Sequence, residues 1–572
     1  MRRIPVVALA LISLGAAPVP TPTPAPGATP TSSDPRVSVD ALFKDYDRTD
    51  TPGCALGIFR DGRVLYSKGY GMANLELAAA ITPQTVFDIG SVSKQFTAFS
   101  IHLLASEGKL SLDDDIRKWV PELPDYGKKV TIRHLLHHTG GLPDYIGLLQ
   151  LQGLLVEDVS NETDAVRLLS TQKTPYFAPG EKYEYSNTGF TLLSVVVERA
   201  SGKSLRDFAA ERIFGPLGMR HTQINETHNR IIPDRATGYR KAEAGGFEID
   251  MSDWEQIGDG GVLTTVEDLQ RWDENFYTPV VGDRALVDAM QQVGVLNNGK
   301  KQTYASGLRI APYRGLDTVG HGGSWAGYRA QILRFPQQHF AVACLCNNGG
   351  TANPGQIVER IADIYLGSLM QPAQAKPETK TDAVRYGISV QELKRLAGAY
   401  RNTDSGQVVE LGVLADKLGG QLGRRKFTLE PTGPGRFRMT GVRGDRTEVS
   451  FSDGGSGARP RMEMKTDYGD DEVERETWEP VTLWKPTASD VAGLAGVYVC
   501  EPVMAIWRFS AEGDKLFFDR RGQSRAALSP TTTDTFSVDG LSLKFQRDAA
   551  KKPTGFTLDS GETKGIAFVR LP

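Results

Sequence analysis

Two serines and a lysine in the segment DIGSVSKQF, residues 88–96, have the types and spacing for nucleophilic catalysis. A serine becomes a nucleophile when a base takes its proton, and a desolvated lysine with a lowered pKa can be that base. Ser91 and Lys94 are three positions apart, which places their side chains on one face of a helix. Ser93 is adjacent to Lys94 and points about 100° away from it. We therefore predict that Ser91 is the nucleophile, at a helix start whose dipole favours a developing anion.

Two further motifs follow in order along the chain. The segment YEYSNTGF contains Tyr185, Ser186 and Asn187, and the segment GHGGSWAGY contains a His-Gly-Gly run that begins at His321. S-x-x-K followed by Y-x-N and by a [K/H]-x-G strand resembles the serine β-lactamases and penicillin-binding proteins. The likeness is greatest to the class C β-lactamase branch, with its D-aminopeptidases, D,D-carboxypeptidases and esterases. It extends over about residues 38–367 through FDIGSVSKQFTA, TIRHLLHHTGGLPDY and GDGGVLTTVEDLQRW.

The resemblance implies a role for each motif residue. Ser91 would attack a carbonyl and form an acyl-enzyme, and Lys94 and Tyr185 would share the transfer of protons. A neutral lysine or a tyrosinate would be favoured by burial or by a neighbouring positive charge. Asn187 would hold the substrate amide or orient Lys94, and the backbone N–H groups of Ser91 and Ser324 would form the oxyanion hole. The family needs neither a metal nor an organic cofactor.

The third motif departs from the β-lactamase pattern. Where β-lactamases carry Lys-Thr/Ser-Gly, this chain has His321, Gly322 and Gly323. Gly322 has no hydroxyl to bind a substrate carboxylate, and a histidine is mostly uncharged at neutral pH although it keeps a donor near the proton relay. Ser324 retains a hydroxyl next to the motif. The departure therefore favours the D-aminopeptidase-like and esterase branches.

Three functional hypotheses remain open at this point. The first is a serine hydrolase acting through an acyl-enzyme on a peptide, of D-aminopeptidase or D,D-peptidase type. The second is a carboxylesterase or weak β-lactamase with the same residues, so the substrate would be a small peptide, an ester or a β-lactam. The third is a binding protein in which the C-terminal domains capture a ligand or cell-wall fragment and the first domain is inert.

The composition is that of an ordinary globular protein. Of the 572 residues, 40% are hydrophobic and 24% are charged, and the formal net charge is −3. Neither a nucleic-acid partner nor a polybasic membrane surface is indicated. After the N-terminus no stretch reaches the roughly 18 apolar residues of a membrane span.

The N-terminus has the pattern of a secretory signal. MRRIPVVALALISLGAA combines two arginines, an apolar run and small residues at a cleavage position, so we assign residues 1–17 to a signal peptide; a retained anchor is the alternative. The Pro/Thr-rich residues 18–37 are expected to be an extended linker. The mature protein is therefore expected to be exported, as a periplasmic or secreted protein without a stable membrane span.

The rest of the chain divides into three domains. Residues 38–367 mix helical and strand patterns, including a hairpin at Asp61-Gly62 and strands at both ends, which predicts an α+β domain with one antiparallel sheet closed by both ends. A linker is expected at residues 368–386. The remainder is strand-rich, and LAGAY at residues 396–400 recurs as LAGVY at residues 494–498. We therefore predict two small antiparallel, lipocalin-like β-barrels over residues 387–485 and 486–572.

The cysteines and histidines outside the motifs are interpreted as structural. Four cysteines are too few for a disulfide framework. We expect buried free thiols, and leave open a bridge from Cys54 to Cys344 or Cys346. The histidine cluster of RHLLHHTGG has no H-E-x-x-H pattern or acidic third ligand, so a metal site is not favoured; its members are His134, His137 and His138.

Four further features of the sequence have a structural interpretation. GGSWA nearly matches the nucleophile elbow of α/β-hydrolases, but its fifth residue is Ala326 and no helix is expected after it. Tyr145 and Trp325 either line a substrate cleft or are packed aromatics. Residues 113–115 are expected to form a solvated turn and a helix cap. The glycine-rich residues 347–355 are expected to form a surface loop, and a loop that cradles a ligand is the alternative.

Overall fold

The computed structural model describes residues 34–572, except for 243, 351, 373–387, 415, 423–424, 442–446, 453–458, 468–472, 523 and 561–562. The expected signal peptide and most of both linkers lie outside the described residues. The expectation of an extended linker is wrong for residues 35–37, which form the first turn of the helix Pro35–Leu42 that Asp34 caps. Within the described residues, no helix combines the length and the apolar character needed to cross a membrane.

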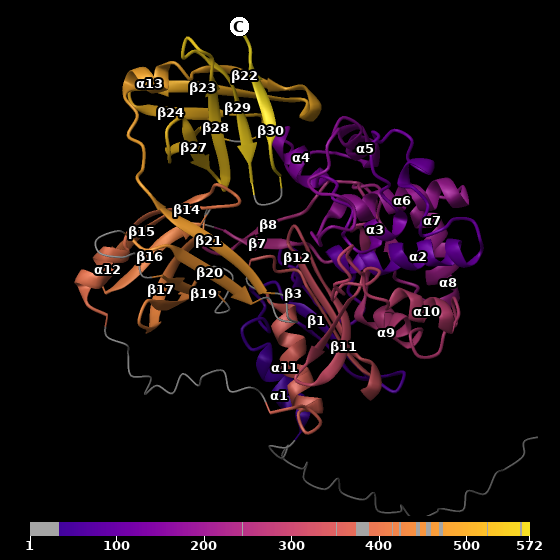
Figure 1. The fold of residues 1–572 in the computed structure, drawn as a ribbon. Helices are drawn as coiled ribbons and strands as arrows, with labels where there is room; N and C mark the ends of the chain where they lie inside the picture. The colour runs from indigo at the N-terminus through magenta and orange to yellow at the C-terminus, as the bar shows by residue number, and fades with distance from the viewer. Residues whose placement is uncertain are drawn as a thin grey trace, which may run out of the picture.

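A six-stranded antiparallel sheet forms the centre of the N-terminal domain (Figure 1). Its strands run in the order β10 (Arg309–Tyr313), β11 (Leu316–Trp325), β12 (Tyr328–Phe335), β13 (Phe340–Cys346), β1 (Cys54–Arg60) and β2 (Arg63–Tyr70). The first strand of the domain thus pairs with the last one, which confirms the expected closure by both ends. Asp61 and Gly62 form the hairpin turn between β1 and β2, and both have positive φ, as a type I′ turn requires.

Helices cover both faces of this sheet because its central strands are apolar on both sides. Leu56 and Ile58 of β1 pack on one face with α1 (Pro35–Leu42) and α11 (Pro354–Leu366). Ala55 and Phe59 lie on the other face with the larger cluster. The helices of the N-terminal domain that contribute to that cluster are α2 (Lys94–Ser106), α3 (Ile132–Leu136), α4 (Tyr145–Leu151), α5 (Glu162–Ser170), α6 (Asn187–Ser201), α7 (Leu205–Ala209), α8 (Gly215–Leu217), α9 (Val266–Glu274) and α10 (Arg284–Met290).

Short strands make three small sheets around the larger cluster. They are β3 (Met72–Asn74) with β4 (Ala79–Ala80), β7 (Tyr239–Lys241) with β8 (Phe247–Ile249), and β5 (Phe87–Asp88) with β9 (Val262–Thr264) and β6 (Gln223–Ile224). Because β5 directly precedes the SVSK segment, its pairing with β9 places the start of α2 beside residues 258–262.

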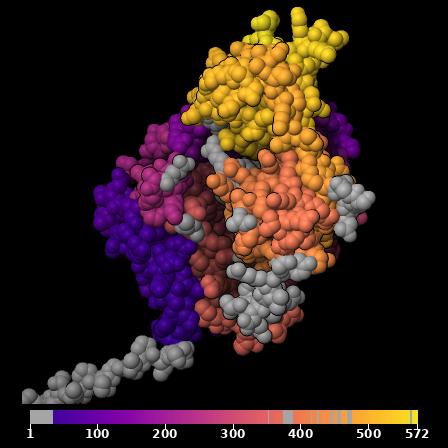
Figure 2. Space-filling view, turned by 90° about the vertical axis from the view of Figure 1, so that its left-hand side faces the viewer, coloured from indigo at the N-terminus to yellow at the C-terminus, as the bar shows by residue number. Residues whose placement is uncertain are grey.

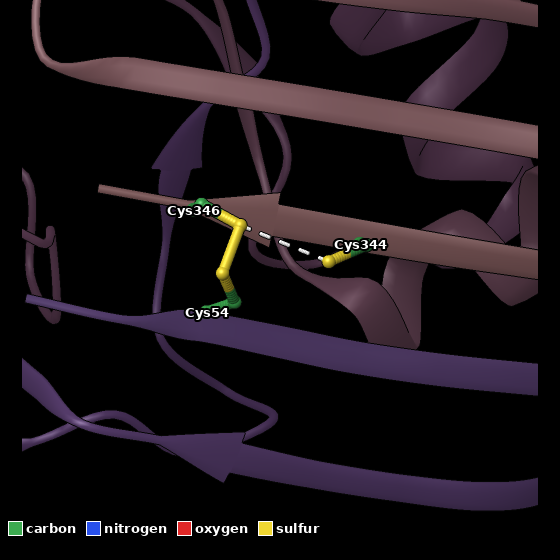
Figure 3. A group of neighbouring side chains, drawn as sticks. All are labelled: Cys54, Cys344 and Cys346. Atoms are coloured by element: carbon green, nitrogen blue, oxygen red, sulfur yellow. Dashed lines mark hydrogen bonds between the residues drawn. A yellow bond between two sulfur atoms is a disulfide. The ribbon is translucent and has the colours of Figure 1, made fainter. Parts of the chain in front are cut away.

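The expectation of free thiols is wrong for two of the four cysteines. Cys54 and Cys346 are directly opposite on the paired strands β1 and β13, with their Cα atoms 4.0 Å apart, and form a disulfide (Figure 3). Cys344 lies two positions along β13 on the same face, with its sulfur 3.7 Å from that of Cys346, and stays a buried thiol. Cys500 is the other buried thiol. The pairing follows from the register of β1 on β13, which no local pattern encodes.

Two β-barrels follow the N-terminal domain, as expected. Barrel 1 is closed and contains β14 (Gly398–Asn402), β15 (Val408–Leu414), β16 (Lys417–Leu422), β17 (Arg425–Gly433), β18 (Arg436–Thr440), β19 (Thr447–Phe451), β20 (Met462–Asp467) and β21 (Val473–Val481). Barrel 2 is one nearly closed sheet of β22 (Gly496–Cys500), β23 (Ala505–Glu512), β24 (Lys515–Asp519), β25 (Ala526–Ala527), β26 (Ser529–Pro530), β27 (Thr535–Val538), β28 (Leu541–Arg547), β29 (Pro553–Asp559) and β30 (Ile566–Arg570). Figure 2 shows barrel 2 at the top of the molecule, above barrel 1.

The repeated LAGAY and LAGVY segments have the same structure in both barrels. Each joins a short helix, α12 (Val390–Leu396) or α13 (Ala488–Ala492), to the first strand of its barrel. The tyrosine hydroxyl donates back to a backbone carbonyl four residues earlier, from Tyr400 in barrel 1 and from Tyr498 in barrel 2. Gly398 and Gly496 have φ values of 129° and 150°, which L side chains rarely adopt. The repeat therefore forms the same corner at the entry of each barrel.

Candidate active site

Ser91 and Lys94 lie at a 3₁₀-to-α junction. Residues Gly90–Ser93 form a 3₁₀ turn, and α2 begins at Lys94. In a 3₁₀ turn the side chains at i and i+3 eclipse one another, so the SxxK spacing aligns the serine with the lysine even more closely than an α-helix would. Lys94 Nζ lies 3.1 Å from Ser91 Oγ. Ser93 is buried on another face, where its Oγ accepts from the N–H of Val262.

Lys94 is fully buried and has three hydrogen-bond acceptors around its ammonium group. These are Ser91 Oγ, Asn187 Oδ1 at 2.9 Å and the backbone carbonyl of Asp259 at 2.8 Å. A protonated lysine has three N–H donors and a neutral one has two and a lone pair. Loss of one proton can therefore leave the bonds to Asn187 and Asp259 in place and direct the lone pair at the serine hydroxyl.

Two buried carboxyl groups surround the lysine. Asp259 accepts from Tyr145 Oη at 3.0 Å and from Thr191 Oγ1 at 2.9 Å. Asp144 caps two helices at once, because its carboxyl oxygens accept from the N–H of Ile146 and from the N–H of Asn187, at 3.1 and 2.6 Å. Both carboxyl groups therefore have fixed positions relative to Lys94.

Burial lowers the pKa of Lys94 from 10.5 to about 8, although the carboxylates of Asp259 and Asp144 act in the opposite direction. Burial likewise raises the pKa of Asp259 from 3.8 to about 6, against the stabilising effect of Lys94 and of the two hydroxyl donors. A lysine with a pKa of about 8 is neutral in about one molecule in ten at pH 7. The site thus contains a neutral amine beside Ser91 at physiological pH.

Tyr185 lies on the other side of the serine. Its hydroxyl interacts with the Ser91 side chain, and its ring lies 5.0 Å from Lys94 Nζ. His138 packs against the same ring, with the ring centroids 4.2 Å apart. Desolvation by the surrounding groups raises the pKa of Tyr185 above its ordinary value, although 37% of the residue is exposed to solvent. Of the two bases that the sequence leaves open, the environment favours the neutral lysine and disfavours the tyrosinate.

His321 does not present a free donor to the proton relay. Its Nδ1 lies 2.6 Å from the carbonyl oxygen of Gly322, which can only accept, so Nδ1 carries the proton. Burial lowers the pKa of His321 to about 3, so the ring is neutral and Nε2 accepts from Tyr304 Oη at 2.8 Å. The N–H donor that the sequence predicts for the proton relay is therefore bonded to the carbonyl of Gly322 and is not available to the relay.

The expected oxyanion-hole groups come together where β11 crosses the 3₁₀ turn. A Cβ on Gly323 would lie 1.9 Å from the carbonyl oxygen of Ile89 and 3.3 Å from the nitrogen of Ser91. A Cβ on Gly90, which has a φ of 49°, would lie 2.7 Å from the nitrogen of Ser324. Only glycine permits this approach at either position. The two backbone N–H groups are therefore held within a few ångströms of each other.

The remaining sequence candidates have structural positions. His134 caps α3, His137 is buried, and Trp325 packs half-buried against Trp254 with the ring centroids 5.6 Å apart. Asp115 caps the short 3₁₀ helix that follows residues 113–115, as expected. The strand β12, and no helix, follows the GGSWA segment. Among the described residues, the one group of three or more potential metal ligands within reach of a single ion is the cysteine cluster of Figure 3.

Sequence reasoning missed several groups of the site. Asp259, Asp144 and Tyr304 contact motif residues or their partners. Asp144 and Asp259 lie in segments that carry the family likeness, but the sequence analysis assigns no role to them, and Tyr304 lies in no such segment. Tyr145, which the sequence left undecided, is 2% exposed and donates to Asp259. The signal that the sequence offers for Asp259 is an aspartate within the glycine-rich segment GDGGVLTT.

Comparison with known proteins agrees with this site. A family model described as beta-lactamase matches residues 39–365, more than half of the chain. A penicillin-binding protein of Bacillus subtilis is 30% identical over 419 residues, which cover 70% of this chain and 89% of that protein. A D-aminopeptidase of Brucella melitensis biotype 2 is 25% identical over 540 residues, which cover 91% of this chain and 96% of that enzyme.

A solved structure agrees as well. The octameric penicillin-binding protein homologue from Pyrococcus abyssi has a TM-score of 0.55 and 26% identity, and the match covers 78% of this chain and 98% of that chain. Together with the serine–lysine pair and the six-stranded sheet, these likenesses establish that the chain belongs to the beta-lactamase family and is a serine hydrolase.

Proposed function

We propose that the chain is an exported peptidase of D-aminopeptidase type that works through an acyl-enzyme on Ser91. The observation that carries the proposal is the hydrogen bond of 3.1 Å between Lys94 Nζ and Ser91 Oγ, made by a buried lysine whose pKa is lowered to about 8. A base with a pKa near the working pH combines a useful neutral fraction with enough basicity to take a proton.

In the proposed reaction Ser91 Oγ forms a bond to the substrate carbonyl carbon while its proton moves to Lys94 Nζ. The negative charge on the carbonyl oxygen is stabilised by the N–H groups of Ser91 and Ser324. The carbon–nitrogen bond then breaks, and the leaving amine receives a proton from Lys94, relayed by the neutral Tyr185 hydroxyl. Water attacks the acyl-enzyme by the same steps in reverse, which releases the acid and restores Ser91.

The other site residues position these groups. Asn187 accepts from Lys94 and keeps the lysine directed at Ser91. The neutral His321 holds Tyr304, whose ring packs against Tyr185 with a centroid separation of 6.1 Å. No step requires a metal or an organic cofactor.

The substrate class is inferred from two supports. The match to the Brucella melitensis D-aminopeptidase spans nearly the whole of both chains, including the region of the barrels. Gly322 also lacks the hydroxyl that the β-lactamase pattern places at this position for a substrate carboxylate. A small peptide or amide of a D-amino acid is therefore the proposed substrate, and an ester or a β-lactam is the alternative for the same residues.

Export is proposed from the N-terminal signal pattern alone. Edman sequencing or intact mass of the protein from the native cell fraction would reveal cleavage near residue 17. Recovery of the unprocessed chain in the cytoplasm would contradict the proposal.

The function is tested by four substrates on one preparation: D-Ala p-nitroanilide, L-Ala p-nitroanilide, a short-chain p-nitrophenyl ester and nitrocefin. We expect cleavage of the D-anilide, loss of that activity in Ser91→Ala, and a fluorophosphonate adduct on Ser91 by mass spectrometry. Ser93→Ala is the matched control, because it removes another hydroxyl two residues away. Ester turnover without amide cleavage would exclude the peptidase, and a Ser91→Ala variant equal to the parent in every assay would support the non-catalytic binding protein.

A further inference from the structure

The short helix α4 connects the active site to barrel 2. Its first residue, Tyr145, donates to Asp259 beside Lys94, whereas its last turn faces barrel 2 (Figure 1). A helix of seven residues is about 10 Å long. A displacement at one end is therefore transmitted to the other end with little loss.

The N-terminal end of α4 fixes groups around the catalytic lysine. Asp144 caps α4 and also accepts from the N–H of Asn187, whose side chain accepts from Lys94. The N–H of Tyr145 donates to Thr188 Oγ1 at 2.8 Å, which joins α4 to the first turn of α6. The position of α4 therefore influences where the carboxyl groups of Asp144 and Asp259 and the side-chain amide of Asn187 lie around Lys94.

Barrel 2 holds the C-terminal end of the same helix. The last carbonyl groups of a helix have no partner within it and carry the negative end of its dipole. Trp507 Nε1 donates to the carbonyl of Leu151 at 3.0 Å, and an Arg520 guanidinium nitrogen donates to the carbonyl of Gln150 at 2.9 Å. Trp507 is fully buried, and the Arg520 guanidinium lies over its indole ring at 5.3 Å.

Barrel 2 and the N-terminal domain share one continuous hydrophobic core, so they are not in loose surface contact. The buried apolar side chains of the two domains form one cluster, whereas those of barrel 1 form a cluster of their own. The backbones also meet closely after α4, since a Cβ on Gly153 would lie 2.3 Å from the carbonyl oxygen of Arg521. Barrel 2 can therefore hold α4 rigidly.

We propose that Trp507 and Arg520 of barrel 2 are positioning residues of the hydrolase. By binding the C-terminal carbonyls of α4 they keep Asp144 and Tyr145 in the places that set the geometry and the proton affinity of Lys94. Barrel 2 thus supports the active site of the N-terminal domain from a distance, through side chains that bind the backbone of α4. This inference rests on the proposed role of Ser91 and Lys94.

The test uses the full chain and compares Trp507→Phe with Tyr498→Phe. Both changes remove one donor to a backbone carbonyl from a fully buried aromatic residue of barrel 2, but the Tyr498 hydroxyl bonds to Leu494 within the barrel. The readouts are the rate of Ser91 labelling by a fluorophosphonate, kcat and KM for the p-nitrophenyl ester, and the pH profile of kcat/KM. We expect labelling and kcat to fall about three- to tenfold in Trp507→Phe with KM nearly unchanged, and the acid limb of the profile to move.

Tyr498→Phe is expected to stay within twofold of the parent in every readout. Equal rates and equal pH profiles in parent and Trp507→Phe would overturn the positioning role, and so would equal losses in both variants. If Trp507→Phe does not fold, the variant Arg520→Gln, which keeps the indole ring, takes its place. The same changes in labelling rate, kcat, KM and pH profile are then required of it. Absence of any Ser91 label in the parent would instead contradict the proposed function, so the two failures are distinguishable.

Discussion

Replacing Asp259 by asparagine tests how the protein sets the proton affinity of its base. The carboxylate of Asp259 is one of two negative charges that raise the pKa of Lys94, against the larger lowering effect of burial. Asparagine keeps the size of the side chain and one acceptor for the donors Tyr145 and Thr191. The change therefore removes a charge and leaves the lysine buried, so the pKa of Lys94 is expected to fall below its value of about 8.

The magnitude follows from Coulomb's law. Two unit charges about 6 Å apart interact by about 2–3 kcal/mol at an effective dielectric constant of about 20, and about 1.4 kcal/mol corresponds to one pKa unit. Because Asp259 has a pKa of about 6, it is almost fully ionised where Lys94 titrates, so the variant loses most of this interaction. The pKa of Lys94 is therefore expected to fall from about 8 by at least about one unit. The neutral fraction of the lysine at pH 7 would then rise from about one tenth to at least about one half.

The assay is the pH dependence of kcat/KM, which reports the ionisations of the free enzyme. The acid limb of Asp259→Asn should lie at least about one pH unit below that of the parent, whatever the height of the plateau. Thr191→Val is the matched control, since it removes a hydroxyl donor and keeps the carboxylate; its limb should stay within a few tenths of a unit. A limb that moves to higher pH in Asp259→Asn, or does not move, would show that the titrating base is not Lys94.

Three further changes test other parts of the structure. Gly323→Ala should slow labelling of the nucleophile at least a hundredfold at unchanged folding, because its Cβ would lie 1.9 Å from the carbonyl oxygen of Ile89 and would disrupt the oxyanion hole; near-parental labelling would contradict that geometry. Asp273→Ala should lower the free energy of unfolding, measured in urea, by about 3–5 kcal/mol. The reason is that the buried Arg334, whose Nε lies 2.5 Å from the carboxylate of Asp273, loses its counter-charge. A loss below about 1 kcal/mol would mean that the pair is solvated. Cys54→Ala should lower the free energy of unfolding, measured by calorimetry, by about 2–4 kcal/mol, because it removes the disulfide to Cys346. The parent protein with this disulfide reduced should match the variant.

The sequence predicted the residues that carry local signals. The SxxK spacing aligned Ser91 with Lys94, and the structure adds that the turn is 3₁₀. The YSN segment was linked to them by the family pattern alone, and Asn187 does lie 2.9 Å from Lys94. The sheet and both barrels could also be predicted, because alternating strands, a hairpin turn and a repeated corner leave periodic traces in the chain.

What could not be predicted depends on long-range register and on burial. The pairing of Cys54 with Cys346 follows from the alignment of β1 on β13, across a sequence separation of 292 residues. The orientation of His321 follows from Tyr304, which precedes β10 and is brought beside the histidine by folding. Neither Cys54 nor Tyr304 lies in a motif that points to its partner, so each pairing becomes visible only in three dimensions.

The departure at the third motif explains why burial has to tune the base in this chain. A lysine at position 321, as in the β-lactamase pattern, would place a second positive charge near Lys94 and lower its pKa directly. Here the residue is a neutral histidine, and the nearby charges of Asp259 and Asp144 raise the pKa of Lys94, so desolvation alone lowers it to about 8. Any change that admits water to the site should then return the pKa towards 10.5 and reduce the neutral fraction at pH 7. Tyr145 of α4 donates to Asp259 beside Lys94, and barrel 2 packs against the other end of α4, so we expect the pKa of the base to depend on this packing.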